Sequence, residues 1–387
     1  MPHPMSGKAA ICGLGMTEMG RVYKSATDLA VEAVRLALKD AGLEMSQLDG
    51  LLVNAGSTRG INLGLHKDLG LKELSVLTFM QGFGSSAGQM IQYAAMAVEN
   101  GMADYIACVF ADDPLKQGKR IGDSYASHSR PEAMASLYPI YGFAGAIPMY
   151  AMGAQRHMDA YGTTQEQLGQ IAISQRQWAA FNENATMRKP MTMEDYHASP
   201  WVVEPFHIVD CCLVSNGGVA VIVTSAERAK DLKQPPVYVR GWAQQHNHDV
   251  GYAGHDPLLE GPGAKAGPRA LAMADAKLED ITQCQLYDCY TYTVLVTLED
   301  YGFCAKGEGG PFVEDGKLGP GGSLPTNTGG GELSSFYMWG MTPVTEGVIQ
   351  ARGQGGDRQA PNDLVLVTGN GGVLNYHAAL LLSPQAA

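Results

Sequence analysis

The sequence lacks the features by which several large classes of protein are recognised. Its seven cysteines are scattered without a Cys-x-x-Cys pair, so neither a structural zinc site nor a disulfide framework is predicted. No apolar run reaches the roughly 20 residues that a membrane-spanning helix needs. The first residues show no charged segment followed by an apolar one, so no secretory signal is predicted. These absences lead us to expect a soluble, cytoplasmic chain.

Positive charge is also scarce. The chain has 27 Lys and Arg against 39 Asp and Glu, a formal net charge of -12, and no basic run, so we expect no binding to nucleic acid or to an anionic membrane. With 45% hydrophobic and 17% charged residues, the composition is typical of a globular protein. At roughly 100–200 residues per domain, this length allows two or three domains. Glycine is abundant, at 48 of 387 residues, and most of it is explained by turns between strands and helices.

Short apolar runs alternate with helical patterns along the chain. Strands are predicted at 8–13, 51–53, 75–78, 106–110, 219–224 and 364–368, and Cys211 and Cys212 are expected to begin a buried strand. Helices are predicted at 28–41, 89–99, 150–158, 165–181 and 344–352. This alternation indicates a layered α/β fold.

The helix–strand pattern at 37–51 recurs at 270–284 with constant spacing. Each copy has a helix, a few polar residues and a short strand, which predicts two similar α/β halves. We place the first half at 1–232, with a helical insertion at about 114–207, and the second at 237–387. The segment 233–236, Lys-Gln-Pro-Pro, is the predicted linker between them.

Four segments resemble the sterol-carrier-type branch of the thiolase superfamily, in order and at family-like spacing. They are AICGLGMT (10–17), RHMDAYGTT (156–164), DCC…NGGVA (210–220) and YDCYT…LEDYG (287–302). The resemblance implies a thiolase fold: two βαβαβαββ halves in five αβαβα layers, with a helical loop domain inserted in the first half. It also implies a dimer.

The resemblance does not extend to the catalytic residues of thiolases. Thiolases need a nucleophilic cysteine at the start of a buried helix, where the helix dipole favours the thiolate. Phe83 or Gly84 stands at that place here, and the C-terminal cysteine region, 368–372, reads TGNGG. Tyr337 replaces the histidine of the Gly-His-Pro turn, and Tyr287 replaces the Asn or His that opens another family motif. Cysteine-based thiolysis therefore lacks its nucleophile.

The substitutions resemble those of the thiolase-fold aldolases that shorten steroid side chains. Those enzymes cleave a β-hydroxyacyl-CoA between its α and β carbons, giving a ketone and a short acyl-CoA such as propionyl-CoA. The resemblance implies acid/base roles for Tyr287 and Tyr337. It also implies a partner protein with an OB fold and a zinc ribbon, alongside a hydratase-like chain, around a homodimer core in a heterotetramer. Zinc is expected only in that partner, and no metal or other cofactor in this chain.

Retro-aldol chemistry is consistent with these residues. The reaction needs a base for the β-hydroxyl, donors for the thioester enolate and an acid for the α carbon, with no covalent step. Because a phenol has a pKa of about 10, a tyrosine base needs nearby donors or positive charge. Backbone N–H groups near Gly330, Gly331, Gly371 and Gly372 are candidates for holding the enolate oxygen. The remaining candidates for the substrate pocket are Phe83, Gly84, His246 and His248.

Two other interpretations of the function remain open. A thiolase or acyltransferase acting on β-ketoacyl-CoA could recruit another nucleophile such as Cys289, and a non-catalytic CoA-ester or lipid-binding subunit would also lack the cysteine. The His and Asp residues at 246–256 match no standard metal motif, so a pocket rim or a partner-contacting loop is the preferred interpretation.

Overall fold

The computed structural model describes residues 3–121, 140, 145–247, 256 and 258–386. Within them, nine strands form one sheet in the order β3-β2-β4-β7-β1-β8-β11-β10-β9. The strands of the first half are β1 (Ala9–Met16), β2 (Gly50–Ala55), β3 (Val76–Phe79), β4 (Tyr105–Asp112) and β7 (Gly217–Ser225). Those of the second half are β8 (Val237–His246), β9 (Gln283–Gln285), β10 (Val365–Gly371) and β11 (Tyr376–Ser383).

The two halves of the sheet repeat one pairing pattern outward from the centre. In the first half, β1 and β4 pair antiparallel with β7, and β4 pairs parallel with β2. In the second half, β8 and β10 pair antiparallel with β11, and β10 pairs parallel with β9. A two-residue contact between β1 and β8 joins the halves. The duplicated topology confirms the fold class predicted from the sequence repeat.

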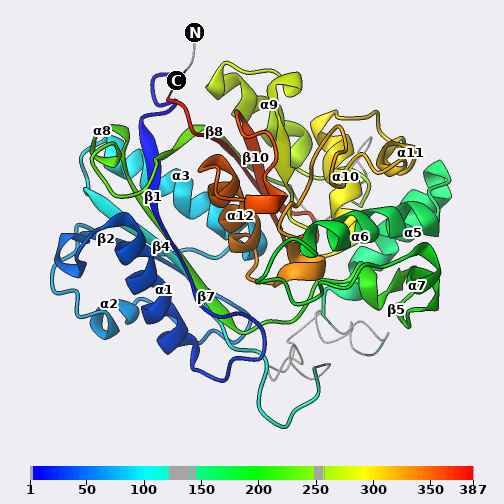
Figure 1. Ribbon diagram of the computed structural model, residues 1–387, viewed down its shortest axis with the longest axis horizontal. Helices are drawn as coiled ribbons and strands as arrows, with labels where there is room; N and C mark the ends of the chain where they lie inside the picture. The colour runs from blue at the N-terminus through cyan, green and yellow to red at the C-terminus, as the bar shows by residue number, and fades with distance from the viewer. Residues whose placement is uncertain (1–2, 122–139, 141–144, 248–255, 257, 387) are drawn as a thin grey trace.

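Helices form three layers around these strands (Figure 1). The outer helix α1 (Ala26–Ala41) packs on β1 and β7, and α9 (Gly263–Ala274) packs on β8 and β11 with α10 (Thr291–Tyr301) beside it. The helices α3 (Ser86–Glu99) and α12 (Met341–Ala351) lie between the strands of the first half and those of the second half. Each of them contacts strands of both halves. The start of α3 therefore lies in the middle of the molecule, where segments of both halves converge.

Local chemistry explains the ends of the outer helix α1. The Ser25 hydroxyl accepts a hydrogen bond from Asp28 N at 3.1 Å, which caps the first turn. Gly42 ends the helix with a φ of 76°, a conformation that glycine adopts without steric cost. The buried face of α1 forms a separate apolar cluster with the outer side of the first half-sheet.

The insertion is helical in its described part. It contains α5 (Ile147–Tyr161), α6 (Gln165–Ala179), α7 (Met193–Ala198) and a hairpin of β5 (Trp201–Val203) and β6 (Phe206–His207). Shorter helices are α2 (Leu65–Asp68), α8 (Ala226–Ala229) and α11 (Gly309–Val313). None of the described helices is long and apolar enough to cross a bilayer.

One predicted strand start was wrong. Cys211 and Cys212 do not begin a strand, and β7 starts only at Gly217. The reason is that Cys212 N donates to Cys289 O at 2.9 Å, so this segment is bonded to the second half of the chain.

Candidate active site

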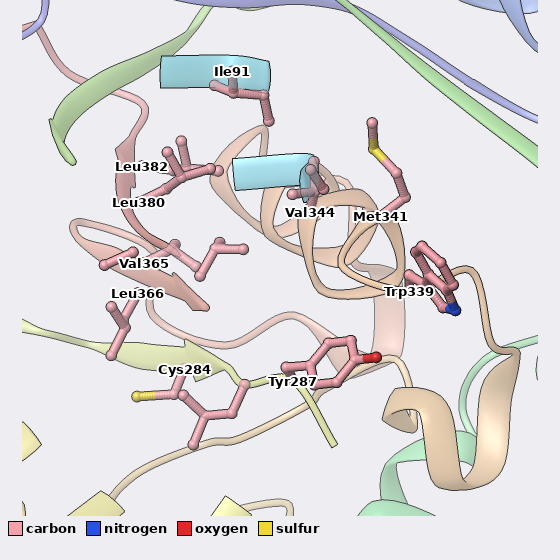
Figure 2. Packing of buried hydrophobic residues seen from close by; sticks show 14 of the residues in the cluster. Ile91, Cys284, Tyr287, Trp339, Met341, Val344, Val365, Leu366, Leu380 and Leu382 are labelled. Carbon is pink, nitrogen blue, oxygen red and sulfur yellow. The ribbon is translucent and has the colours of Figure 1, made fainter. Parts of the chain in front are cut away.

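The hydroxyl groups of Tyr287 and Tyr337 lie 2.9 Å apart, at hydrogen-bond distance. Tyr287 follows β9, and Tyr337 follows the single π-helical turn η7 (Gly331–Ser335). Figure 2 shows the Tyr287 ring at the edge of the apolar cluster, with its hydroxyl directed away from Cys284. Tyr287 is only 3% exposed, and Tyr337 is half-buried. The two tyrosines predicted as catalytic therefore form one hydrogen-bonded pair.

Gly84 lies directly against the ring of Tyr287. A Cβ atom built on Gly84 would overlap Cε2 and Cζ of that ring and the carbonyl oxygen of Asn370. Gly84 belongs to the short turn η2 (Phe83–Ser85) that leads into α3. The phenol ring therefore fills the space beside Gly84, one of the two residues that the family resemblance places at the nucleophile position, and no side chain fits there.

Aromatic side chains surround the start of α3. Phe83 and Trp339 have positive φ values, 53° and 48°, and their ring centroids are 5.8 Å apart. Such backbone conformations in bulky residues cost on the order of 1 kcal/mol and cluster at functional sites. Tyr376 stacks on Phe83 at 6.3 Å, and His246 contacts Tyr376 edge-on at 5.6 Å. Because Phe83 and Tyr376 are 47% and 37% exposed, they form an accessible apolar surface.

Burial makes both phenols weak acids. Desolvation raises the pKa of Tyr287 and of Tyr337 well above the ordinary value, and the carboxyl group of Glu332 acts in the same direction on both. Among the described residues, no cation is one of the main causes of either shift. Both tyrosines are therefore neutral at physiological pH, each with a hydroxyl that can donate and accept a proton.

The glycines that were predicted to hold the enolate oxygen have different surroundings. The N–H of Gly330 donates to Asn327 O at 2.8 Å, so it is already paired and is not available to an enolate. Gly331 lies against the carboxylate of Asp288. Gly372 has a φ of 60° and faces the ring of Tyr376.

Of the two histidines predicted for the substrate pocket, the structure describes only His246. His246 ends β8 and contacts the aromatic surface rather than the tyrosine pair, and burial lowers its pKa. His248 lies outside the described residues. Within the described part of the chain, no three His, Cys, Asp or Glu residues gather as a metal site.

Sequence reasoning missed two buried carboxyl groups beside the tyrosines. The carboxylate of Asp288 accepts hydrogen bonds from the backbone N–H groups of Glu332 and Leu333, and burial raises its pKa to about 7. Glu332 is fully buried, and burial raises its pKa well above the usual range. Both adjoin motif residues, Tyr287 and Gly331, and that adjacency was the only available signal.

A hydrogen-bond network connects Tyr301, His377 and Asn370 on one side of the site. Tyr301 donates to Nε2 of His377 at 2.7 Å, and Nδ1 of His377 bonds to Oδ1 of Asn370. The carbonyl oxygen of Asn370 in turn lies against Gly84. Burial lowers the pKa of His377 to about 3, so its imidazole is neutral in the folded protein.

The neutral His377 predicts a specific loss of stability in acid. An unfolded histidine takes up a proton below about pH 6.5, whereas the folded one does not until about pH 3. His377 therefore contributes stability above the unfolded pKa, and the contribution falls with the pH. Between pH 7 and pH 5, wild type is expected to lose about 2 kcal/mol more unfolding free energy than His377→Gln. Urea unfolding of both proteins at each pH measures the difference, and parallel pH profiles would contradict it.

Together, the duplicated fold and its central site define a protein of the thiolase fold whose site contains a hydrogen-bonded pair of tyrosines. Comparison with known proteins agrees. The family described as "Thiolase C-terminal domain-like" matches residues 243–384.

Three relatives narrow this class. The chain is 37% identical to the "Steroid side-chain-cleaving aldolase" of Thermomonospora curvata, over 95% of this chain and 96% of the relative. It is 36% identical to the "17-hydroxy-3-oxo-4-pregnene-20-carboxyl-CoA lyase" of Mycobacterium tuberculosis, over 95% and 98%. A solved structure titled "Ltp2-ChsH2(DUF35) aldolase" superposes with a TM-score of 0.88 at 35% identity, over 98% of each chain. The chain belongs to the thiolase superfamily, in the branch that contains these aldolases.

Proposed function

We propose that the protein is a carbon–carbon lyase that cleaves a β-hydroxyacyl-CoA thioester by a retro-aldol reaction. The products are a ketone and a short acyl-CoA such as propionyl-CoA. The observation that carries the proposal is the 2.9 Å hydrogen bond between Tyr287 and Tyr337, beside the closely packed Gly84. The relatives named as aldolase and CoA lyase support it.

The tyrosine pair suits a reaction whose net effect is the movement of one proton. As the bond between the α and β carbons breaks, its electrons form the thioester enolate and the β-oxygen becomes a carbonyl. One phenol accepts the hydroxyl proton while its own proton passes to the other phenol, which protonates the α carbon. Because the protons move along one hydrogen-bonded pair, no phenolate accumulates, as the raised pKa of both tyrosines requires. These steps use no bound cofactor, because coenzyme A is part of the substrate.

The aromatic surface of Phe83, Trp339 and Tyr376 suits a broad apolar substrate. Rings pack face to face or edge to face on such side chains, and Phe83 and Tyr376 are exposed enough to do so. We therefore propose a steroid-like ring system with a tertiary hydroxyl on its side chain, as the names of the relatives suggest.

Thiolysis by Cys289 is the less favoured alternative. Burial raises the pKa of the Cys289 thiol well above its usual value, and the carboxyl of Glu332 raises it further. In the part of the chain that the structure describes, no histidine or other cation is among the main causes that lower the pKa of this thiol. A thiol in such surroundings is inert at neutral pH.

A partner protein belongs to the proposal. The similar solved structure carries two protein names in its title, Ltp2 and ChsH2(DUF35). We propose that this chain forms a homodimer that binds a partner with an OB fold and a zinc ribbon, alongside a hydratase-like chain, with any zinc held by the partner.

The decisive experiment compares two substrates. The purified chain, with and without the zinc-ribbon protein, is incubated with a β-hydroxyacyl-CoA bearing a tertiary hydroxyl, and separately with a β-ketoacyl-CoA plus free CoA. Mass spectrometry is expected to detect ketone and short acyl-CoA from the first substrate only. Splitting of the β-ketoacyl-CoA alone would establish the thiolase alternative. Binding of both without cleavage would establish a non-catalytic subunit.

A further inference from the structure

Glu332 is a fully buried acid whose carboxyl group has no hydrogen-bond partner in the part of the chain that the structure describes. Its side chain is 0% exposed, and neither carboxyl oxygen has a hydrogen-bond partner among the described residues. Buried carboxyl groups are normally paired with a cation or satisfied by several donors, because desolvation is costly. A fully buried carboxyl without either is an exception that requires an explanation.

The backbone of Glu332 is fixed, so the side chain does not lack partners because of a loose loop. Its N–H donates to both oxygens of Asp288 at 2.9 Å, and its carbonyl accepts from Leu213 N at 2.9 Å. The residue lies in η7, a single π-helical turn, and such turns occur frequently at functional sites.

A second unpartnered polar side chain lies against the same turn. Gln175, on α6, is 1% exposed, and neither its amide oxygen nor its amide nitrogen has a hydrogen-bond partner in the described part of the chain. Gln175 adjoins Gly331, because a Cβ atom on Gly331 would come within 2.8 Å of the amide oxygen. Two fully buried polar groups without partners among the described residues, at one turn, indicate a binding site for a polar group from outside the chain.

That place adjoins the tyrosine pair. The backbone N–H of Glu332 donates to the carboxyl group of Asp288, the residue after Tyr287, and Glu332 itself lies five positions before Tyr337. Burial and the neighbouring carboxyl group of Asp288 raise the pKa of Glu332, and no basic group among the described residues is a cause of the shift. These surroundings hold Glu332 as a neutral carboxylic acid, which has one O–H to donate.

We propose that Glu332, as a neutral acid, donates a hydrogen bond to the thioester oxygen of the substrate and stabilises the enolate formed next to the tyrosine pair. Carboxylic acids kept neutral in apolar sites act in this way in other enolate-forming enzymes. The inference rests on the proposed retro-aldol function. It assigns the enolate oxygen to a side chain, where the sequence indicated backbone N–H groups near Gly330, Gly331, Gly371 and Gly372, of which that of Gly330 is already paired.

Two substitutions test the donor role kinetically. Glu332→Met keeps the approximate volume and removes the donor, and it is expected to lower kcat about 10²–10³-fold. Glu332→Gln keeps a neutral donor of similar shape and is expected to recover most of that loss. Thermal unfolding of both variants controls for folding. Equal kcat values for the Met and Gln variants would overturn the proposal.

Difference infrared spectroscopy tests the contact without relying on turnover. The full chain, with its partner where cleavage requires one, is compared with Glu332→Gln at pH 7. The wild type is expected to show the C=O stretch of a protonated carboxylic acid, and propionyl-CoA, a thioester without the β-hydroxyl, is expected to shift it. Absence of that band, or a band unmoved by the bound thioester, would overturn the proposal. Because propionyl-CoA is not cleaved, failure here is distinguishable from failure of the retro-aldol function itself.

Discussion

Tyr337→Phe is expected to lower kcat about 10²–10⁴-fold while leaving substrate binding intact, the range typical of losing a general acid or base. The substitution removes one oxygen and keeps the ring, so packing around the site is preserved. It breaks the 2.9 Å bond to Tyr287 and leaves the α carbon or the β-hydroxyl without its proton-transfer partner. Tyr287→Phe is expected to have a similar effect. The measurement is release of ketone and short acyl-CoA, followed by mass spectrometry at saturating substrate.

A double substitution tests whether the two tyrosines act as one proton relay or as two independent catalytic groups. If the tyrosines act as one unit, Tyr287→Phe combined with Tyr337→Phe loses little more activity than either change alone. Multiplicative losses would indicate separate roles. Tyr292→Phe is the matched control, since Tyr292 is a buried tyrosine of the same segment whose hydroxyl bonds to the Leu258 carbonyl. It is expected to cost about 1 kcal/mol of stability and to leave kcat unchanged. Full activity of Tyr337→Phe would contradict the tyrosine mechanism.

The parts of the fold that were predicted from the sequence are those with clear periodicity. The helix predicted at 28–41 is α1 (Ala26–Ala41), and the strand predicted at 106–110 is β4 (Tyr105–Asp112). The segment Thr291–Tyr301 shows why other elements were not predicted. Its valines, threonines and tyrosines favour strands by propensity, yet it forms the helix α10, almost wholly buried beside α9 and α6. Tertiary packing overrides local preference there.

The site was predictable only through resemblance. Tyr287 and Tyr337 are separated by 50 positions, and nothing in their local pattern indicates that their hydroxyls meet. The role proposed for Glu332 depends on an absence of partners among the described residues, which is a property of three-dimensional surroundings rather than of sequence. The hydrogen bond from the N–H of Gly330 to Asn327 also depends on the three-dimensional structure, and it makes Gly330 unsuitable as a donor to the enolate oxygen.

The second large effect is expected from the smallest substitution at the site, Gly84→Ala. The added methyl group would overlap Cε2 and Cζ of Tyr287 and the carbonyl oxygen of Asn370, so the phenol ring has to move. Overpacking of this kind costs about 1–3 kcal/mol of stability. Displacing the Tyr287 hydroxyl from its partner is expected to lower kcat about 10²-fold, because misplacing a catalytic group by an ångström costs that much.

A stability cycle with Tyr287→Leu identifies the cause. Leucine lacks the Cε2 and Cζ atoms that the methyl group meets, so Gly84→Ala is expected to cost less stability in that background than in wild type. The remaining cost reports the contact with Asn370. Urea unfolding of the four proteins gives the coupling energy. Equal costs in both backgrounds, together with unchanged kcat in Gly84→Ala, would show that Gly84 does not set the position of the phenol. Unequal costs would establish that the absence of a side chain at Gly84 is what makes room for the ring of Tyr287.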